Sequence, residues 1–275
     1  MFLLPVFLLA LTLVDIEMRR HTILLFGVLH FLVYPSSNAF NGLQDRDKGS
    51  IAGVKNPPKA PKLLIPITII FDAAALIISY NISRGLFFMM LLYIVASRLY
   101  SYRKIRIKKY AVLSYLLVIS MQGGLVFIMT AYTAKRWAIL NLLGSPEMLL
   151  GILSAVILIA AGYPITQIYQ HRQDKADGVH TISMMLDKLG TLTLSALLFI
   201  AFGATLALLY QPEWEFILLF ALISAPAGIY LVSWMLRVMN NRREANYENT
   251  MRMNYISSLS LNSYFIVVLI LQYTT

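Results

Sequence analysis

Apolar residues occur along this chain in long runs, without the strict alternation that marks a half-buried strand. Nine runs approach the length of about 20 residues that a helix needs to cross the core of a bilayer. They cover roughly 1–15, 21–40, 62–80, 84–101, 110–131, 147–166, 189–210, 213–236 and 254–273. The pattern predicts an all-α, polytopic integral membrane protein with about nine transmembrane helices. No linker or soluble-looking stretch divides the chain, so we expect residues 1–275 to form a single transmembrane helical domain.

The composition agrees with a protein in lipid. The chain is 59% hydrophobic and 13% charged, whereas soluble domains carry about 25% charged residues. It contains no Cys, which excludes disulfides and thiolate metal sites. Its net charge of +10 does not indicate nucleic-acid binding, because membrane proteins concentrate Lys and Arg in their cytoplasmic loops.

The positions of the basic residues predict the topology. Of the 23 Lys and Arg residues, 17 lie in the loops that follow the second, fourth, sixth and eighth runs. By the positive-inside rule these loops face the cytoplasm and the C-terminus lies outside. We therefore expect a multi-pass protein of the inner cell membrane whose polar motifs face the cytoplasm.

Three polar segments begin at the predicted cytoplasmic ends of apolar runs. They are NAFNGLQDRDKGS (38–50), YSYRKIRIKKY (100–110) and YPITQIYQHRQDKADGVHT (163–181). Since all three fall on one side of a helical bundle, they could converge on one pocket.

The first segment offers oxygen ligands. Asn41 and Asp45 are four residues apart and would share one face of a helix. Mg²⁺ is usually held by one or two carboxylates together with substrate phosphates, so this pair could bind it. Asp47 would lie on another face and could pair with a base. A solvated acidic helix end is the alternative interpretation.

The segment 163–181 also offers side-chain oxygen ligands. Gln167, Gln170 and Asp174 are three and four residues apart, which predicts a single stripe of side-chain oxygens along a helix. Amides at the end of an apolar run are costly unless they face protein, water or ligand. For His171 and His180, hydrogen bonding or exposure is favoured over metal binding.

The segment between them is dense in cations. Lys104, Arg106 and Lys108 recur at every second position, which suits a loop that turns its cations toward a common point. Arg offers a fork of donors to phosphate, and Lys offers a mobile point charge. For Arg103 and Lys109 ordinary positive-inside charge is preferred. Together the three segments indicate a diphosphate site bridged by Mg²⁺, with a lipid tail buried among the apolar helices.

These segments resemble the motifs of the UbiA-type intramembrane prenyltransferase superfamily. The family's first motif, N-D-x-x-D-x-x-x-D, corresponds to NGLQDRDKG, in which Gly42 and Gly49 replace two acids. Its Y-S-x-P-P-L-R-L-K segment corresponds to YSYRKIRIK, which keeps the Tyr, Ser, Arg and final Lys. In its second motif, Gln167 and Gln170 stand where two acids are usual, and Asp174 is kept.

The resemblance implies a nine-helix fold and Mg²⁺-dependent transfer of a prenyl group from a prenyl diphosphate to an aromatic or other lipophilic acceptor. It implies catalytic roles for Asp45, Asp174 and Arg106. The metal ligands would come from Asn41, Asp45, Asp174 and Asp177. The expected substrate-binding residues are Asn41, Tyr100, Lys104, Arg106, Lys108, Tyr163, Gln167 and Gln170.

Two other functions stay open. The same site could cyclise a prenyl diphosphate as a terpene cyclase, or the protein could be a non-catalytic lipid binder that kept the fold. Asp72 is the one acid deep in a predicted helix. It could face the pocket, pair with Arg98, or join a polar contact between helices.

Overall fold

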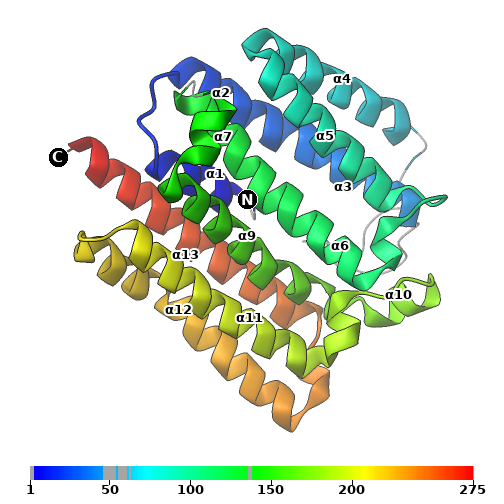
Figure 1. The fold of residues 1–275 in the computed structure, drawn as a ribbon. Coiled ribbons are helices and arrows are strands. Elements are labelled where there is room, and N and C mark those ends of the chain that lie inside the picture. The colour runs from blue at the N-terminus through cyan, green and yellow to red at the C-terminus, as the bar shows by residue number, and fades with distance from the viewer. Residues whose placement is uncertain (1–2, 46–53, 55–60, 62, 136–137, 275) are drawn as a thin grey trace.

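The computed structural model describes residues 3–45, 54, 61, 63–135 and 138–274. Every regular element in these ranges is a helix, which confirms the all-α prediction (Figure 1). The α-helices are α1 (Leu4–Thr12), α2 (Arg19–Gly27), α3 (Tyr34–Asp45), α4 (Leu64–Ile82), α5 (Arg84–Ser101), α6 (Ala111–Val118), α7 (Val126–Lys135), α8 (Ile139–Gly144), α9 (Pro146–Gln167), α10 (His171–Ala176), α11 (Ile182–Leu209), α12 (Trp214–Asn240) and α13 (Tyr247–Thr274).

Four shorter helical elements complete the chain. Two are π-helical turns inside longer helices, η1 (Val28–Val33) and η3 (Ile119–Leu125). They join α2 to α3 and α6 to α7, so that Arg19–Asp45 and Ala111–Lys135 each run as one membrane-length helix. The other two are 3₁₀ turns in loops, η2 (Ile107–Lys109) and η4 (Arg242–Glu244).

Seven helical segments in the described part of the chain are long and apolar enough to cross a membrane. The prediction of nine spans is therefore not confirmed. Helices are present at the two remaining places, but α1 has only 9 residues, about 14 Å of a core about 30 Å thick. Helix α5 carries Arg84 and Arg98, which lower its hydropathy. Large apolar side chains on the outer surface, such as Leu222 at 73% and Ile200 at 71% exposed, suit contact with lipid.

The short helix α1 lies in the middle of the bundle. Its residues from Pro5 to Thr12 are all buried, and it packs against α7, α9 and α13. Helices α3, α4 and α5 pack together on one side of it, while α11, α12 and α13 pack together on the other (Figure 1). The apolar core therefore holds two helix groups around a central helix.

The polar segments meet at one end of the bundle. In the loop after α5, the backbone N–H of Arg103 donates to Gln44 Oε1 at the end of α3 (3.2 Å). In the same loop Arg106 reaches Asp177, just beyond α10. Figure 1 shows this loop and α10 side by side. The expected convergence of the three polar segments is confirmed.

Candidate active site

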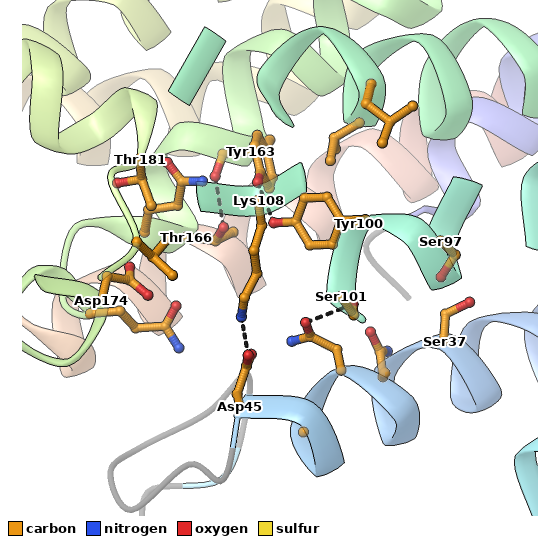
Figure 2. A pocket seen from close by; sticks show the side chains of 18 of the residues that line it. Ser37, Asp45, Ser97, Tyr100, Ser101, Lys108, Tyr163, Thr166, Asp174 and Thr181 are labelled. Atoms are coloured by element: carbon orange, nitrogen blue, oxygen red, sulfur yellow. Dashed lines mark hydrogen bonds and ion pairs between the residues drawn. The ribbon is translucent and has the colours of Figure 1, made fainter. Parts of the chain in front are cut away.

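A cavity of about 360 Å³ opens where the three polar segments meet. Its walls come from the C-terminal parts of α3, α5 and α9, from the loop after α5, from η3 and from the region around α10. Polar side chains dominate the part shown in Figure 2, including Ser37, Asp45, Ser97, Tyr100, Ser101, Lys108, Tyr163, Thr166, Asp174 and Thr181. Such a mixture of oxygens and a cation suits a charged, oxygen-rich ligand.

The wall formed by α3 presents the first motif. Asn41 and Asp45 line the cavity, as expected for residues that share one helix face, and the neighbouring Gly42 lines it as well. Asn41 Oδ1 accepts a hydrogen bond from Ser101 Oγ at 2.9 Å, which fixes the amide against α5. A Cβ added at Gly42 would meet nothing within 4 Å. Packing at this position would therefore allow a side chain, including the acid that the family motif has there.

The loop after α5 buries two of its cations. Lys108 lines the cavity, whereas Arg106 is not among the lining residues but contacts two carboxylates that are. Lys108 Nζ forms an ion pair with Asp45, and Arg106 lies 3.5 Å from the same carboxylate. The Lys108 and Asp45 side chains are both only 9% exposed. Arg106 has a left-handed backbone (φ 52°), a conformation that costs energy for a residue with a side chain. Arg106 thus contacts Asp45 and Asp177 from a strained backbone conformation.

Asp177 completes the ionic network from the side of α10. It pairs with Arg106, whose Nη1 also donates to the Asp177 carbonyl (2.9 Å), and with Arg103 at 3.0 Å. Burial opposes the charged form of Asp177, but the hydrogen bond and charge of Arg106 outweigh it and lower the pKa of Asp177. Burial likewise opposes the charge of Arg106, yet its bonds to Asp177 and Asp45 raise its pKa. Both groups stay ionised at neutral pH.

The expectation of a single helical stripe of oxygens after α9 is wrong. Gln167, Gln170 and Asp174 do not follow one helical stripe, because α9 ends at Gln167 and α10 begins only at His171. A turn separates them, and Gln167 Oε1 accepts a bond from the Ser183 N–H at the start of α11 (3.3 Å). All three side chains nevertheless line the cavity. Gln167 is held there by its bond to α11, while Gln170 and Asp174 reach the cavity from beyond the turn.

Tyrosines line the inner part of the cavity. The hydroxyls of Tyr100 and Tyr163 lie 2.7 Å apart (Figure 2), and Tyr115 stacks on Tyr163 with ring centroids 6.4 Å apart. Tyr93 and Gln122 line the same region. Gln122 was missed by the sequence analysis, although a lone amide inside an apolar run is the signal that singled out Gln167. The hydroxyls of Ser37, Ser97 and Thr166 were also missed, since Ser and Thr are common in membrane helices.

Several other predicted residues lie apart from the cavity. Lys104 is exposed and is not among the lining residues. His171 Nε2 lies 2.8 Å from Ser183 Oγ, and His180 is exposed, as favoured from the sequence. Asp72 pairs with Arg98 and also accepts a hydrogen bond from Ser36 of α3, so two of its three alternatives, the ion pair and the polar contact between helices, hold together. Asp47 lies outside the described residues.

The carboxylates fit a metal ion only in combination with a ligand. Within the described ranges, no group of three His, Cys, Asp or Glu side chains is arranged to hold a metal. Asp45, Asp174 and Asp177 line the cavity, but Asp45 and Asp177 are already paired with cations. Mg²⁺ commonly keeps waters and binds through one or two carboxylates plus phosphate oxygens. The donor set suits that mode and not an all-protein cage.

Comparison with known proteins gives one family and one fold. A sequence model of the UbiA prenyltransferase family matches residues 2–256. No curated protein matches the chain significantly.

Three solved structures illustrate the shared fold. A UbiA homolog from Archaeoglobus fulgidus bound to DMAPP and Mg²⁺ is 18% identical, with a TM-score of 0.64 over 97% of this chain and 94% of that one. A UbiA homolog from Archaeoglobus fulgidus bound to GPP and Mg²⁺ is also 18% identical, with a TM-score of 0.61 over 97% of this chain and 94% of that one. An apo UbiA homolog from Aeropyrum pernix K1 is 15% identical, with a TM-score of 0.64 over 96% of this chain and 97% of that one.

Proposed function

The chain belongs to the UbiA prenyltransferase family, and from this premise we propose that it transfers a prenyl group from a prenyl diphosphate to an aromatic or other lipophilic acceptor, using Mg²⁺. The observation that carries the proposal is the cavity where Asp45, Asp174 and Lys108, from distant parts of the chain, line one space. Family members of this fold have been solved with DMAPP or GPP and Mg²⁺, which supports the donor class.

The diphosphate would bind at the charged end of the cavity. Arg106 and Lys108 would neutralise the negative charge that grows on the leaving diphosphate. Asp45 and Asp174, with Asn41 and Asp177 beside them, would hold the metal. Bound Mg²⁺ would share the diphosphate charge as a Lewis acid.

The prenyl chain would extend toward the tyrosines. Aromatic faces stabilise a cation through their quadrupoles, so Tyr100 and Tyr163 are suited to face the allylic carbon as its bond to oxygen breaks. Their hydroxyls also bond one another, which leaves fewer free oxygens near that carbon. Gln167 and Gln170 would contribute amide oxygens and hydrogen-bond donors in place of charge.

The site would face the cytoplasm of the inner cell membrane. Of the 23 Lys and Arg residues, 17 lie in the four loops predicted to be cytoplasmic, and the loop after α5 and the loop around α10 contribute residues to the cavity. This supports the orientation by the positive-inside rule.

The direct test is the reaction itself. Purified protein in lipid vesicles, supplied with membrane lipid extract and labelled geranyl or geranylgeranyl diphosphate, should yield a labelled, heavier lipid in Mg²⁺ and none in EDTA. Asp174→Asn should lower the rate by about a hundredfold. A cyclic hydrocarbon as the sole product would establish a terpene cyclase instead. Bound donor with no diphosphate release in either medium would establish a lipid binder.

A gain-of-function variant tests the metal assignment. Gly42→Asp returns an acid to the cavity wall, one residue from Asn41, at a place where packing leaves room for a side chain. It should lower the Mg²⁺ concentration needed for half-maximal activity. Gly27→Ala is a matched control, because a Cβ there also meets nothing within 4 Å but Gly27 does not line the cavity.

A further inference from the structure

The two buried cations of the loop after α5 are already neutralised by carboxylates that line the cavity. Lys108 is paired with Asp45, and Arg106 with both Asp45 and Asp177 (Figure 2 shows Lys108 directed at Asp45). The Asp45–Lys108 pair joins the end of α3 to the loop across 63 residues of sequence. Its two side chains are 9% exposed, so water screens the attraction less than it does at a surface.

Because of this pairing, an anion that enters the cavity must compete with Asp45 for Lys108. If a diphosphate displaces Asp45, that buried carboxylate keeps only the more distant Arg106, at 3.5 Å, which Asp177 already shares. Such a weakly paired buried carboxylate is unfavourable. A divalent cation that approaches Asp45 meets the converse problem, because it leaves Lys108 without an anion. Either ligand alone therefore breaks a pair without replacing it.

Both ligands together avoid that cost. If Asp45 moves onto the metal and Lys108 moves onto the diphosphate, every charge keeps an opposite charge beside it. We propose that the Asp45–Lys108 ion pair is a latch that couples the binding of Mg²⁺ and of diphosphate in this cavity, so that each is held weakly without the other. The latch rests on the proposed function for the identity of its two ligands.

The coupling has a thermodynamic consequence. The factor by which Mg²⁺ strengthens diphosphate binding equals the factor by which diphosphate strengthens Mg²⁺ binding, and such factors are commonly about 5–150-fold. The latch also gives the enzyme selectivity for a metal-complexed donor. A phosphorylated lipid without bound metal would have to displace Asp45 unaided and would therefore bind more weakly by that factor.

The test is a binding measurement on the full-length protein in detergent, with inorganic diphosphate as the probe, in EDTA and in Mg²⁺. In EDTA, Asp45→Asn should bind diphosphate about tenfold more tightly than the wild type, because Lys108 is released. The gain that Mg²⁺ adds should shrink in the same variant. Since Mg²⁺ also binds diphosphate in solution, each variant is compared with the wild type in the same medium.

Three further variants separate the latch from a change in net charge. Asp174→Asn removes the same charge from the opposite wall but leaves the pair intact, so it should tighten metal-free binding much less. Adding Lys108→Met to Asp45→Asn should abolish the gain. Asp15→Asn, which breaks an ion pair with Lys135 at the far end of the bundle (3.0 Å), should match the wild type.

The outcomes are distinct from those for the proposed function. Metal-free binding that is unchanged or weaker in Asp45→Asn, or an equal gain in Asp174→Asn, would overturn the latch even if prenyl transfer is observed. Conversely, the expected binding pattern without any product would support the latch and contradict the prenyltransferase. Thermal unfolding of each variant shows whether a loss of binding reflects a loss of fold.

Discussion

The ion pair of Asp72 and Arg98 illustrates how single residues hold the wall of the cavity in place. Arg98 Nε donates to Asp72 at 3.0 Å, and Ser36 Oγ donates to the other carboxylate oxygen at 2.7 Å. The guanidinium also lies 4.2 Å from the centre of the Phe40 ring. These contacts tie together α3, α4 and α5 behind the residues that line the cavity. The pair therefore acts on the site by fixing the helices that carry it.

Removing one partner should show this role. Asp72→Leu leaves Arg98 partly buried without its anion, so the free energy of unfolding should fall by roughly 1–3 kcal/mol. Replacing both partners, as Asp72→Leu with Arg98→Met, should recover most of the loss, because no unpaired charge remains. Thermal unfolding in one detergent compares the three proteins. A double variant no more stable than the single one would show that the pair itself, and not the orphaned charge, matters.

His171 gives a prediction for pH. Burial and the charge of Lys188 lower its pKa from the usual value near 6.5. The unfolded chain therefore binds a proton before the folded protein does, and stability should fall as pH decreases below about 6.5. His171→Gln keeps a group able to bond Ser183 but does not titrate. Between pH 7.5 and 5.5 this variant should lose less thermal stability than the wild type, and equal losses would exclude His171 as the cause.

At the scale of elements, the cavity depends on close helix packing behind its inner wall. Gly123 in η3 lies against α9, where an added Cβ would come within 2.8 Å of both Ala155 O and Val156 Cα. At the next residue, Gly124, the nearest atom would be a Val156 methyl at 3.4 Å. Small residues commonly allow membrane helices to approach so closely.

This difference makes the two glycines a matched pair. Gly123→Ala should push η3 away from α9 and lower the free energy of unfolding by about 1–3 kcal/mol, because backbone atoms cannot yield cheaply. It should also weaken donor binding, since Gln122 and Met121 line the cavity from η3. Gly124→Ala should change both quantities little. The prediction fails if the two variants unfold at the same temperature.

The sequence predicted the helices and the meeting of three polar segments, because hydropathy and charge are read locally along the chain. It did not predict which loop cations are buried. Lys104 and Lys108 have the same spacing from Arg106, but the left-handed backbone at Arg106 and the position of Asp45 bury only one of them. The end of α9 at Gln167 was predicted to within one residue, but the turn between α9 and α10 was not. No Gly or Pro lies between Gln167 and Asp174 to indicate it, and the contact of Gln167 with Ser183 of α11 is not visible in the sequence.

At the scale of the whole molecule, the topology can be tested by labelling. The sequence has no Cys, so a single introduced Cys has no background. Arg243 and Glu213 are both exposed and lie at opposite ends of α12. A membrane-impermeant maleimide should label Glu213→Cys in intact spheroplasts and Arg243→Cys only in inverted vesicles. The reverse pattern would place the cavity on the outer side of the membrane.

The proposed reaction requires a diphosphate held between the α3 wall, the loop after α5 and the region of α10. The most direct measurement is an experimental structure with a non-hydrolysable prenyl thiolodiphosphate and Mg²⁺. We predict that the diphosphate contacts Lys108 and Arg106, that the metal lies between it and Asp45 or Asp174, and that the prenyl chain runs past Tyr100 and Tyr163. A diphosphate bound elsewhere, or an Asp45–Lys108 ion pair that stays intact with the ligand present, would contradict this arrangement.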